Sequence, residues 1–153
     1  MKIKIEIDDA MDDLEVIIKA KQLDEDVIAI QKRLNYVSDY KLSVFKQDSE
    51  YFIPIQEILF IEANDSRIYV HTIQKIFESH EKLYQLEAKM PIQFCRISKS
   101  VLVNIKAIYA LDRSFSGTST IRFAHCHKQV HVSRHYYKFL KDKLNEMRYL
   151  YEN

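Results

Sequence analysis

The chain has 153 residues, 47% of them hydrophobic and 29% charged, which is typical of one globular domain with a small appendage. No apolar run approaches the ~20 residues of a membrane-spanning helix, and the charged start is unlike a signal peptide, so we expect a cytoplasmic protein. With a single glycine, Gly117, the chain cannot form a glycine-rich phosphate loop or a nucleophile elbow. We therefore expect no enzymatic activity, no cofactor and no small-molecule substrate.

Charge is unevenly distributed along the chain. Residues 1–40 carry a net charge of −4 and residues 41–90 a net charge of −2, whereas residues 91–153 carry +7 from eleven Lys and Arg against four Asp and Glu. A basic segment joined to an acidic one suggests a polyanion partner for the basic segment. Lysines on a solvated helix face would produce the same excess, so charge alone leaves both interpretations open.

The first forty residues are predicted to form a β-β-α appendage. Lys2–Ile7 alternates charged and aliphatic residues with period two, which is typical of a strand. Leu14–Ala20 is rich in β-branched residues and is expected to be a second strand. Asp24 can cap a helix that runs to about Tyr36, with apolar residues at spacings of three and four. This acidic segment is a candidate interface for a dimer or another partner.

From residue 41 onward, short strand-like runs separated by polar turns predict a mostly antiparallel β body. The expected strands before the middle of the chain are 41–46, 51–53, 58–62, 67–72 and 75–77. A helix at 82–89 follows, and then strands at 94–97, 100–103 and 129–132, with a hairpin of 108–115 and 118–124. The last helix is expected from Ser133, as its N-cap, to about Tyr149.

A histidine–cysteine cluster, His125-Cys126-His127, is the one group with the chemistry of a metal site. Thiolate and imidazole ligands would suit zinc or copper. Alternation along a hairpin would place His125 and His127 on one face and Cys126 on the other. We favour a plain turn and expect no bound metal, with a metal-responsive sensor as an alternative function.

The segment Arg96–Ser100 packs cations and hydroxyls between two apolar β runs. Short hydroxyl donors and long cations on a rigid backbone are what contacts to DNA phosphates or base edges require. A polar turn with solvated cations explains the same residues, so chemistry alone does not decide between the two interpretations.

Residues 40–148 resemble the LytTR family of DNA-binding domains along nearly their whole length. The resemblance rests on the order and spacing of several pieces, which are Ile58–Glu62, Ile68–Thr72, the helix Leu83–Met90, Phe94–Asn104 and Val132–Arg134. The start of the chain is similar to the leader of small stand-alone LytTR regulators of Gram-positive bacteria, which lack a receiver domain.

The resemblance implies a mainly β fold, α+β overall, with an elongated body of about ten short strands in three small sheets. The short mid-chain helix, the C-terminal helix and the N-terminal appendage would complete this fold. Residues 41–153 would form the DNA-binding domain, whose loops, rather than a recognition helix, would enter successive major grooves.

Three loop regions carry the DNA contacts that the resemblance implies. The first is the turn Asn64–Arg67. This loop varies in length within the family, so either Ser66 or Arg67 lies nearest the base-contacting position.

The hairpin before the last strand departs from the family pattern, since His125–Lys128 stands where Asn-Gly is usual. The geometry of that hairpin is therefore open.

The second and third regions are better defined. Lys99 occupies the contact position of Ser98–Ser100, and Arg96 either approaches phosphate or braces the loop. In the third region the fork of Arg134 suits guanine O6 and N7. The full expected DNA-binding set is Ser66, Arg67, Arg96, Ser98, Lys99, Ser100, Ser133 and Arg134.

The sequence thus predicts a transcriptional regulator that binds specific double-stranded DNA. Family members commonly bind paired repeats as dimers, so we expect a homodimer, and a membrane-bound inhibitor protein is a further expected partner. The main alternative is a module for RNA or single-stranded nucleic acid, which would need exposed aromatic side chains for stacking.

Overall fold

The computed structural model describes residues 1–12, 14–34, 40–114 and 117–152. Its helices are α1 (Glu25–Leu34), α2 (Leu83–Lys89) and α3 (Arg134–Glu152). Its strands are β1 (Lys41–Lys46), β2 (Ser49–Pro54), β3 (Phe60–Asn64), β4 (Arg67–His71), β5 (Ile76–Ser79), β6 (Phe94–Ser98), β7 (Val101–Asn104), β8 (Ile108–Arg113), β9 (Ser119–Phe123) and β10 (Gln129–Val132). No helix within these ranges is both long and apolar enough to cross a membrane.

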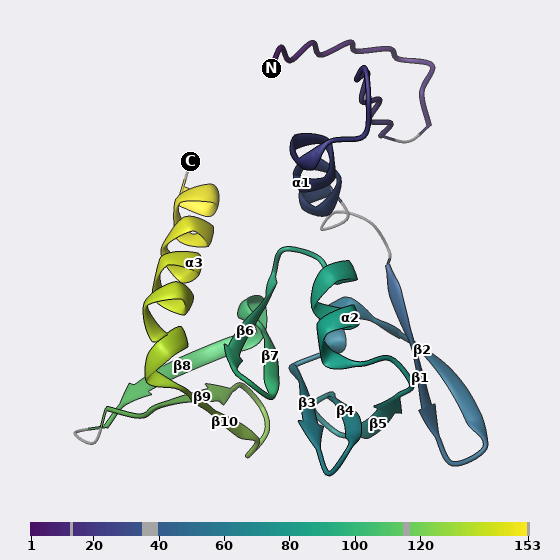
Figure 1. The fold of residues 1–153 in the computed structure, drawn as a ribbon. Coiled ribbons are helices and arrows are strands. Elements are labelled where there is room, and N and C mark those ends of the chain that lie inside the picture. Colours follow the sequence, from purple (N-terminus) through teal and green to yellow (C-terminus); the bar gives the residue numbers. More distant parts are fainter. Residues whose placement is uncertain (13, 35–39, 115–116, 153) are drawn as a thin grey trace.

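The strands form two antiparallel sheets (Figure 1), a larger one with the order β2-β1-β5-β4-β3-β7-β6 and a smaller one with the order β10-β9-β8. The described residues thus confirm ten strands in a mainly β fold, but the expectation of three small sheets is wrong. The reason is β7, which pairs with β6 on one side and with β3 on the other, where Phe60 lies opposite Val103. Pairing on both sides of β7 fuses two groups of strands into one sheet.

Two apolar clusters hold the β body together. One lies between the larger sheet and α2 and includes Leu42, Ile61 and Leu86. The other joins the two sheets to α3 and includes Ile121 and Leu140. Each fully buried side chain of this size stabilises the fold by about 1.5–3 kcal/mol. These clusters therefore fix the strand ends from which the expected contact loops emerge.

The expected C-terminal hairpin is confirmed as β8 and β9, with Arg113 opposite Ser119. Two residues of its connection, 115 and 116, lie outside the described residues. The last helix is confirmed as α3, and the mid-chain helix as α2.

The N-terminal appendage differs from the prediction. Helix α1 is present, and Val27 N donates to the capping Asp24 Oδ1 at 3.0 Å, although residues 35 and 36 of the expected helix lie outside the described residues. The two expected strands, Lys2–Ile7 and Leu14–Ala20, are not formed in residues 1–12 and 14–24. An isolated hairpin is marginal in water, and these residues are exposed, with no sheet beside them to extend.

Candidate nucleic-acid interface

Two backbone hydrogen bonds hold the three expected contact loops at one end of the molecule. The amide of Ala63, just before the β3–β4 turn, donates to the carbonyl of Ser100 in the β6–β7 turn at 2.8 Å. The amide of Ser133, which follows β10, donates to the carbonyl of Ile97 in β6 at 2.9 Å. The β3–β4 and β6–β7 turns point the same way, toward the lower side of Figure 1, while α1 and the N-terminus lie at the top. The fold thus brings together three segments that are far apart in sequence.

The β3–β4 turn presents Ser66 to solvent. Asn64 and Arg67 face each other across the hairpin, and Asp65 and Ser66 between them have φ of 47° and 66°. Two central residues with positive φ form a type I′ turn, whose twist matches that of the paired strands. The Arg67 guanidinium donates to Glu78 Oε1 at 3.1 Å, so it is held toward β5.

The β6–β7 turn is braced by Arg96. Its guanidinium donates to the carbonyl of Lys99 at 2.6 Å, and its Nε donates to Glu87 of α2 at 2.8 Å. Ser98 Oγ accepts a hydrogen bond from the amide of Ser100 at 3.3 Å, and the two hydroxyl oxygens lie 3.4 Å apart. Lys99 is exposed at the tip of this turn. Arg96 therefore positions the turn, and Lys99 is the cation that the turn presents.

The third segment joins β10 to α3. The Ser133 side chain does not cap the helix as expected, because its buried Oγ has no hydrogen-bond partner among the described residues. A backbone bond from the amide of Tyr136 to the carbonyl of Ser133, at 3.1 Å, closes the first turn instead. Arg134 packs against Gly117, where a Cβ would lie 2.6 Å from Arg134 Nε. The glycine therefore leaves room for the Arg134 side chain beside β9.

A surface groove connects the second and third segments. Ser98, Ser100, Ser133 and His131 line it, together with Glu62 of β3. Hydroxyl and imidazole groups can donate or accept hydrogen bonds, so the groove can meet several kinds of polar ligand atom. Glu62 is the one carboxylate among its described lining residues. Sequence analysis missed it, because an acidic residue within a strand carries no local signal of what it faces.

Glu62 is held by a buried histidine. His71 Nε2 lies 2.8 Å from Glu62 Oε1, and the imidazole ring stacks on Phe60 with ring centroids 4.1 Å apart. His71 Nδ1 is buried without a hydrogen-bond partner among the described residues. A second proton would have to reside on this unpartnered nitrogen, so burial lowers the pKa of His71 below its ordinary 6.5 despite the opposing effect of Glu62.

Acid should destabilise this part of the fold through His71. In the unfolded chain a histidine keeps its ordinary pKa, so between that pKa and the lower pKa of the folded state the unfolded chain binds more protons, and stability falls as pH falls. We expect the urea midpoint of the parent chain to decrease from about pH 7.5 to about pH 5.5. The decrease should be smaller in His71→Gln, which cannot titrate. An equal decrease in both proteins would assign the acid sensitivity to other groups.

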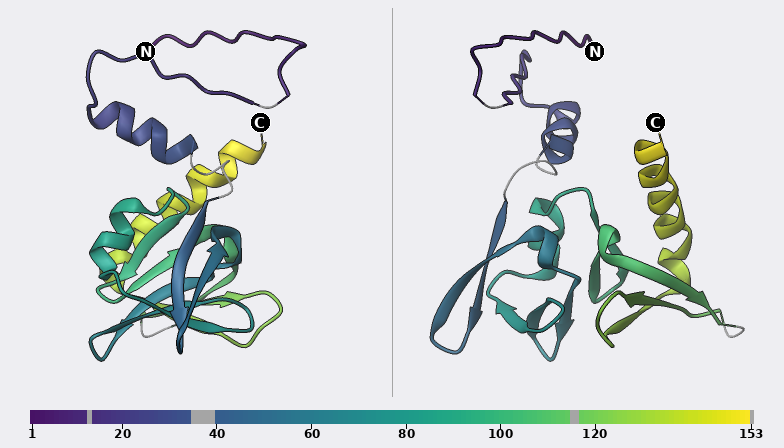
Figure 2. Two further views of the ribbon diagram at one scale, coloured as in Figure 1. Left: turned by 90° about the vertical axis from the view of Figure 1, so that its right-hand side faces the viewer. Right: turned by 180° about the vertical axis from the view of Figure 1, so that it is seen from behind.

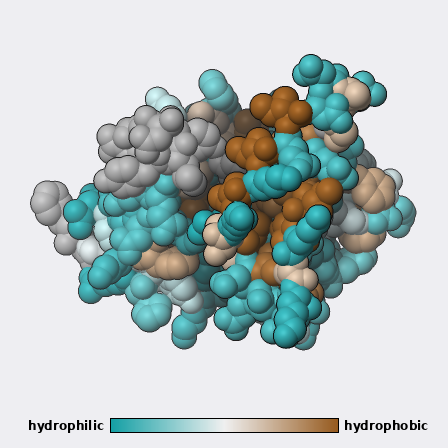
Figure 3. All heavy atoms as spheres, turned by 90° about the horizontal axis from the view of Figure 1, so that it is seen from above, coloured by the Kyte–Doolittle hydropathy of each residue, from teal (hydrophilic) through white to brown (hydrophobic). Residues whose placement is uncertain are grey.

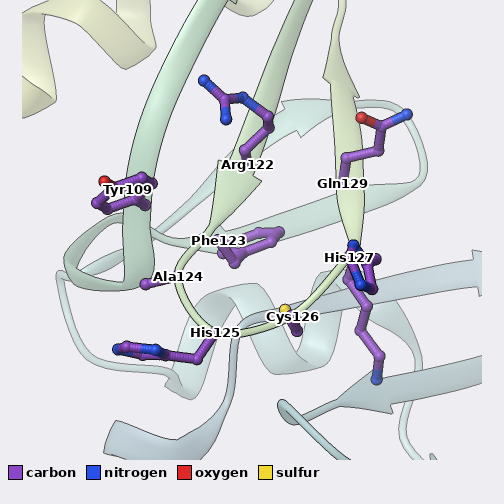
Figure 4. Close-up of a pocket in the computed structure, with 9 residues that line it drawn as sticks. Tyr109, Arg122, Phe123, Ala124, His125, Cys126, His127 and Gln129 are labelled. Carbon is purple, nitrogen blue, oxygen red and sulfur yellow. The ribbon is translucent and has the colours of Figure 1, made fainter.

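The β9–β10 turn does not gather metal ligands. Figure 4 shows His125 and His127 on opposite sides of the turn with Cys126 between them, so the expectation that the two histidines share a face is wrong. His125 has φ of 62°, which breaks the alternation of a strand. Among the described residues no group of three His, Cys, Asp or Glu side chains is placed to hold a metal ion. Lys128 instead donates to the carbonyl of Thr72 at 2.7 Å and ties this turn to the larger sheet.

Comparison with known families identifies the domain. The family model of the LytTr DNA-binding domain matches residues 48–145, a span that contains all three expected contact loops. The chain belongs to the LytTR family. Its resemblance in sequence to this family is therefore confirmed, together with the DNA-binding character of the domain.

Several curated relatives match this LytTR chain. Sensory transduction proteins LytT from Bacillus cereus and Bacillus anthracis are each 30% identical, over 71% and 69% of this chain. The matched part covers 44% and 43% of those proteins, so the chain corresponds to less than half of their length. An uncharacterized HTH-type transcriptional regulator from Staphylococcus aureus is 26% identical, over 84% of this chain and 87% of that protein.

A solved LytTr DNA-binding domain from Bacillus cereus has the same fold, with a TM-score of 0.65 and 21% identity. The match covers 70% of this LytTR chain and 98% of that domain. In the described residues, five strands separate α1 from α2 and another five separate α2 from α3. A helix–turn–helix unit needs two consecutive helices, so none is present in this part of the chain.

Proposed function

We propose that this chain is a sequence-specific regulator of transcription that reads double-stranded DNA with loops in successive major grooves. One observation carries the proposal. Backbone hydrogen bonds hold the β3–β4 turn, the β6–β7 turn and the β10–α3 junction together at one end of a LytTR domain. Each segment has an exposed cation, namely Arg67, Lys99 and Arg134, and that of the β3–β4 turn, Arg67, is paired with Glu78. The net charge of +7 in residues 91–153 supplies attraction to phosphate.

Each segment offers DNA a different chemistry. Arg134 has a fork that can donate to guanine O6 and N7 together. Lys99 is a compact cation suited to a phosphate or a base acceptor, and the hydroxyl groups of these loops suit phosphate oxygens. Those hydroxyls belong to Ser66, Ser98 and Ser100, whereas the Oγ of Ser133 is buried. The part of Ser133 in the proposal is to hold the β10–α3 junction beside β6 through its backbone amide. Arg67 and Arg96 are held by carboxylates of the domain, so their part in the proposal is to position the turns.

Binding as a homodimer to paired repeats would use two copies of this set of loops. The second repeat is then bound at high effective concentration, which raises affinity without a new kind of contact. The membrane-bound inhibitor expected from the resemblance stays a proposed partner of the same regulator.

A module for RNA or single strands finds less support. Such modules stack successive bases on neighbouring aromatic side chains. The exposed aromatic residues in the described part of this chain are dispersed over β2, α2, β8 and α3, and they are Tyr51, Phe52, Tyr84, Tyr109 and Phe139. Their dispersal offers no continuous stacking row, which favours duplex DNA as the partner.

Lys99→Ala should weaken binding to the cognate duplex and lower the salt dependence of that binding. Each lysine–phosphate contact releases condensed counterions, so its loss should reduce the slope of log K against log salt by about one. Fluorescence anisotropy titrations of a labelled duplex at several salt concentrations measure both effects.

Lys41→Ala is the matched control, because Lys41 is an exposed lysine at the start of β1, outside the three contact loops. It removes the same charge from the chain and should leave the salt slope unchanged. If Lys99→Ala and Lys41→Ala bind alike, Lys99 does not touch DNA.

A further inference from the structure

Most of the exposed large hydrophobic residues lie in residues 1–34. Of eighteen in the described residues, eleven fall between Met1 and Ile28. Figure 3 is a view from above, onto the side where the N-terminus lies in Figure 1, and it shows hydrophobic residues gathered on that side. At roughly 100 Å² of apolar surface each, the eleven expose on the order of 1,000 Å², more than the roughly 800 Å² that each partner contributes to a standard interface. An apolar surface of this extent marks an interaction site.

The segment Lys2–Ile7 has the residue pattern of a strand and leads into a turn, but among the described residues no strand lies beside it. Its isoleucines alternate with charged residues, and Lys4 contacts Glu6 on the same face. The chain then reverses, with the amide of Ala10 donating to Asp8 Oδ1 at 3.0 Å. The left view of Figure 2 shows the chain running out from the N-terminus and, after residue 13, running back toward α1.

We propose that Lys2–Asp8 pairs antiparallel with the same segment of a second copy of this chain, about a two-fold axis at Ile5. The facing pairs are Lys2 with Asp8, Ile3 with Ile7, Lys4 with Glu6, and Ile5 with itself. Every lysine then meets a carboxylate and every isoleucine meets an isoleucine. Both kinds of cross-strand pair stabilise a sheet.

The neighbouring registers are less favourable. An axis at Lys4 would place Lys4 opposite itself, and an axis at Glu6 would place Glu6 opposite itself, so each brings like charges face to face. A slip of one residue would place isoleucines opposite charged residues and turn the apolar row to the wrong face of the sheet. The charge pattern therefore selects the axis at Ile5.

The rest of the N-terminal segment completes a shared domain. Leu14–Ala20 flanks each central strand, which gives four strands in the dimer. Helix α1 has an apolar stripe of Val27, Ile30 and Leu34, and none of its residues is buried in the single chain. One hairpin with one helix is too small to be stable by itself. In the dimer, the apolar stripes of the two α1 helices are enough to cover one face of the shared four-stranded sheet.

This interface leaves the contact loops accessible. The N-terminal segment lies at the opposite side of the molecule from the β3–β4 and β6–β7 turns (Figures 1 and 2). This interface would be that of the homodimer proposed above, but the pairing of the two N-terminal strands does not require DNA.

Sedimentation equilibrium of the full chain tests the register by charge exchange. Lys4→Glu and Glu6→Lys, made separately, should each raise the dissociation constant of the dimer about tenfold, because each places like charges opposite one another twice. The two substitutions combined should return it to within about threefold of the parent, because they restore opposite charges. Lys21→Glu makes the same charge change at an exposed residue outside the strand and should have no effect.

Three results would overturn the inference. They are a parent chain that stays monomeric at about 100 μM, a dimer that persists in Ile5→Asp, and a combined variant as weak as the single ones. DNA binding is measured separately by anisotropy. A monomer that still binds one repeat overturns this inference alone, whereas an N-terminal dimer that binds no duplex overturns the proposed function alone.

Discussion

Replacing Arg134 by alanine should reduce the affinity for the cognate duplex by about 5- to 150-fold and relax the base preference at one position. The reason is the loss of a bidentate pair with guanine, which is worth about 1–3 kcal/mol of discrimination. Arg134 is the first residue of α3, and the tie from Ser133 to β6 fixes its backbone beside the β6–β7 turn. Selection of bound duplexes from a random library, for parent and variant, would deliver the target sequence and show the position that relaxes.

Arg134→Lys separates base recognition from charge. Lysine keeps the positive charge but lacks the planar fork, so this variant should keep the salt slope of the parent and still show the relaxed base position. Arg33→Ala, at an exposed arginine of α1, is the control for general charge loss. A uniform loss of affinity for all sequences in Arg134→Ala would make Arg134 a phosphate contact. Unfolding midpoints should confirm that the variants stay folded.

Replacing Asn104 by alanine should destabilise the domain by about 2–4 kcal/mol, because buried polar partners lose their hydrogen bonds. Asn104 is 1% exposed, and its Nδ2 donates to the carbonyl of Ile58 at 2.8 Å. Its Oδ1 accepts from Gln93 Nε2 and from the amide of Lys106, both at 3.2 Å. Urea unfolding monitored by circular dichroism would measure the change, with an unaltered m-value.

Asn64→Ala is the matched control for stability. Asn64 is exposed beside the β3–β4 turn, so the same substitution there should change stability by less than about 0.5 kcal/mol. If Asn104→Ala proves equally mild, the network around Ile58 and Gln93 does not stabilise the fold. Asn104→Ala should also retain DNA binding at temperatures where it is folded, since its side chain is buried away from solvent.

The strands of residues 41–132, and the β3–β4 turn, could be predicted because their signals are local. Alternation of apolar and polar residues, with Asn64-Asp65-Ser66 between two runs, is enough to indicate a hairpin. The structure confirms this turn, and the two positive φ values at Asp65 and Ser66 agree with the residue types. Helix α1 was likewise predicted from a cap, Asp24, and a stripe of apolar residues.

The same local signals failed for Lys2–Ile7 and Leu14–Ala20. A period-two pattern indicates that a segment can form a β-strand. A strand is stable only beside another strand and against an apolar surface, and the pattern does not show whether either is present. In the described residues of the single chain these segments are exposed and form no strand. For this reason their pattern is better evidence for a partner than for a strand of the monomer.

The sequence by itself determined a mostly antiparallel β body and a basic C-terminal part, and its resemblance to the LytTR family indicated the three segments to inspect. Only the tertiary structure decided how those segments meet, because hydrogen bonds such as Ala63 to Ser100 join residues far apart in the chain. It also decided that Arg96 braces a turn and that Glu62 lines the groove. Those roles depend on which side chains become neighbours in space, and that follows from packing of the whole domain rather than from any short stretch of sequence.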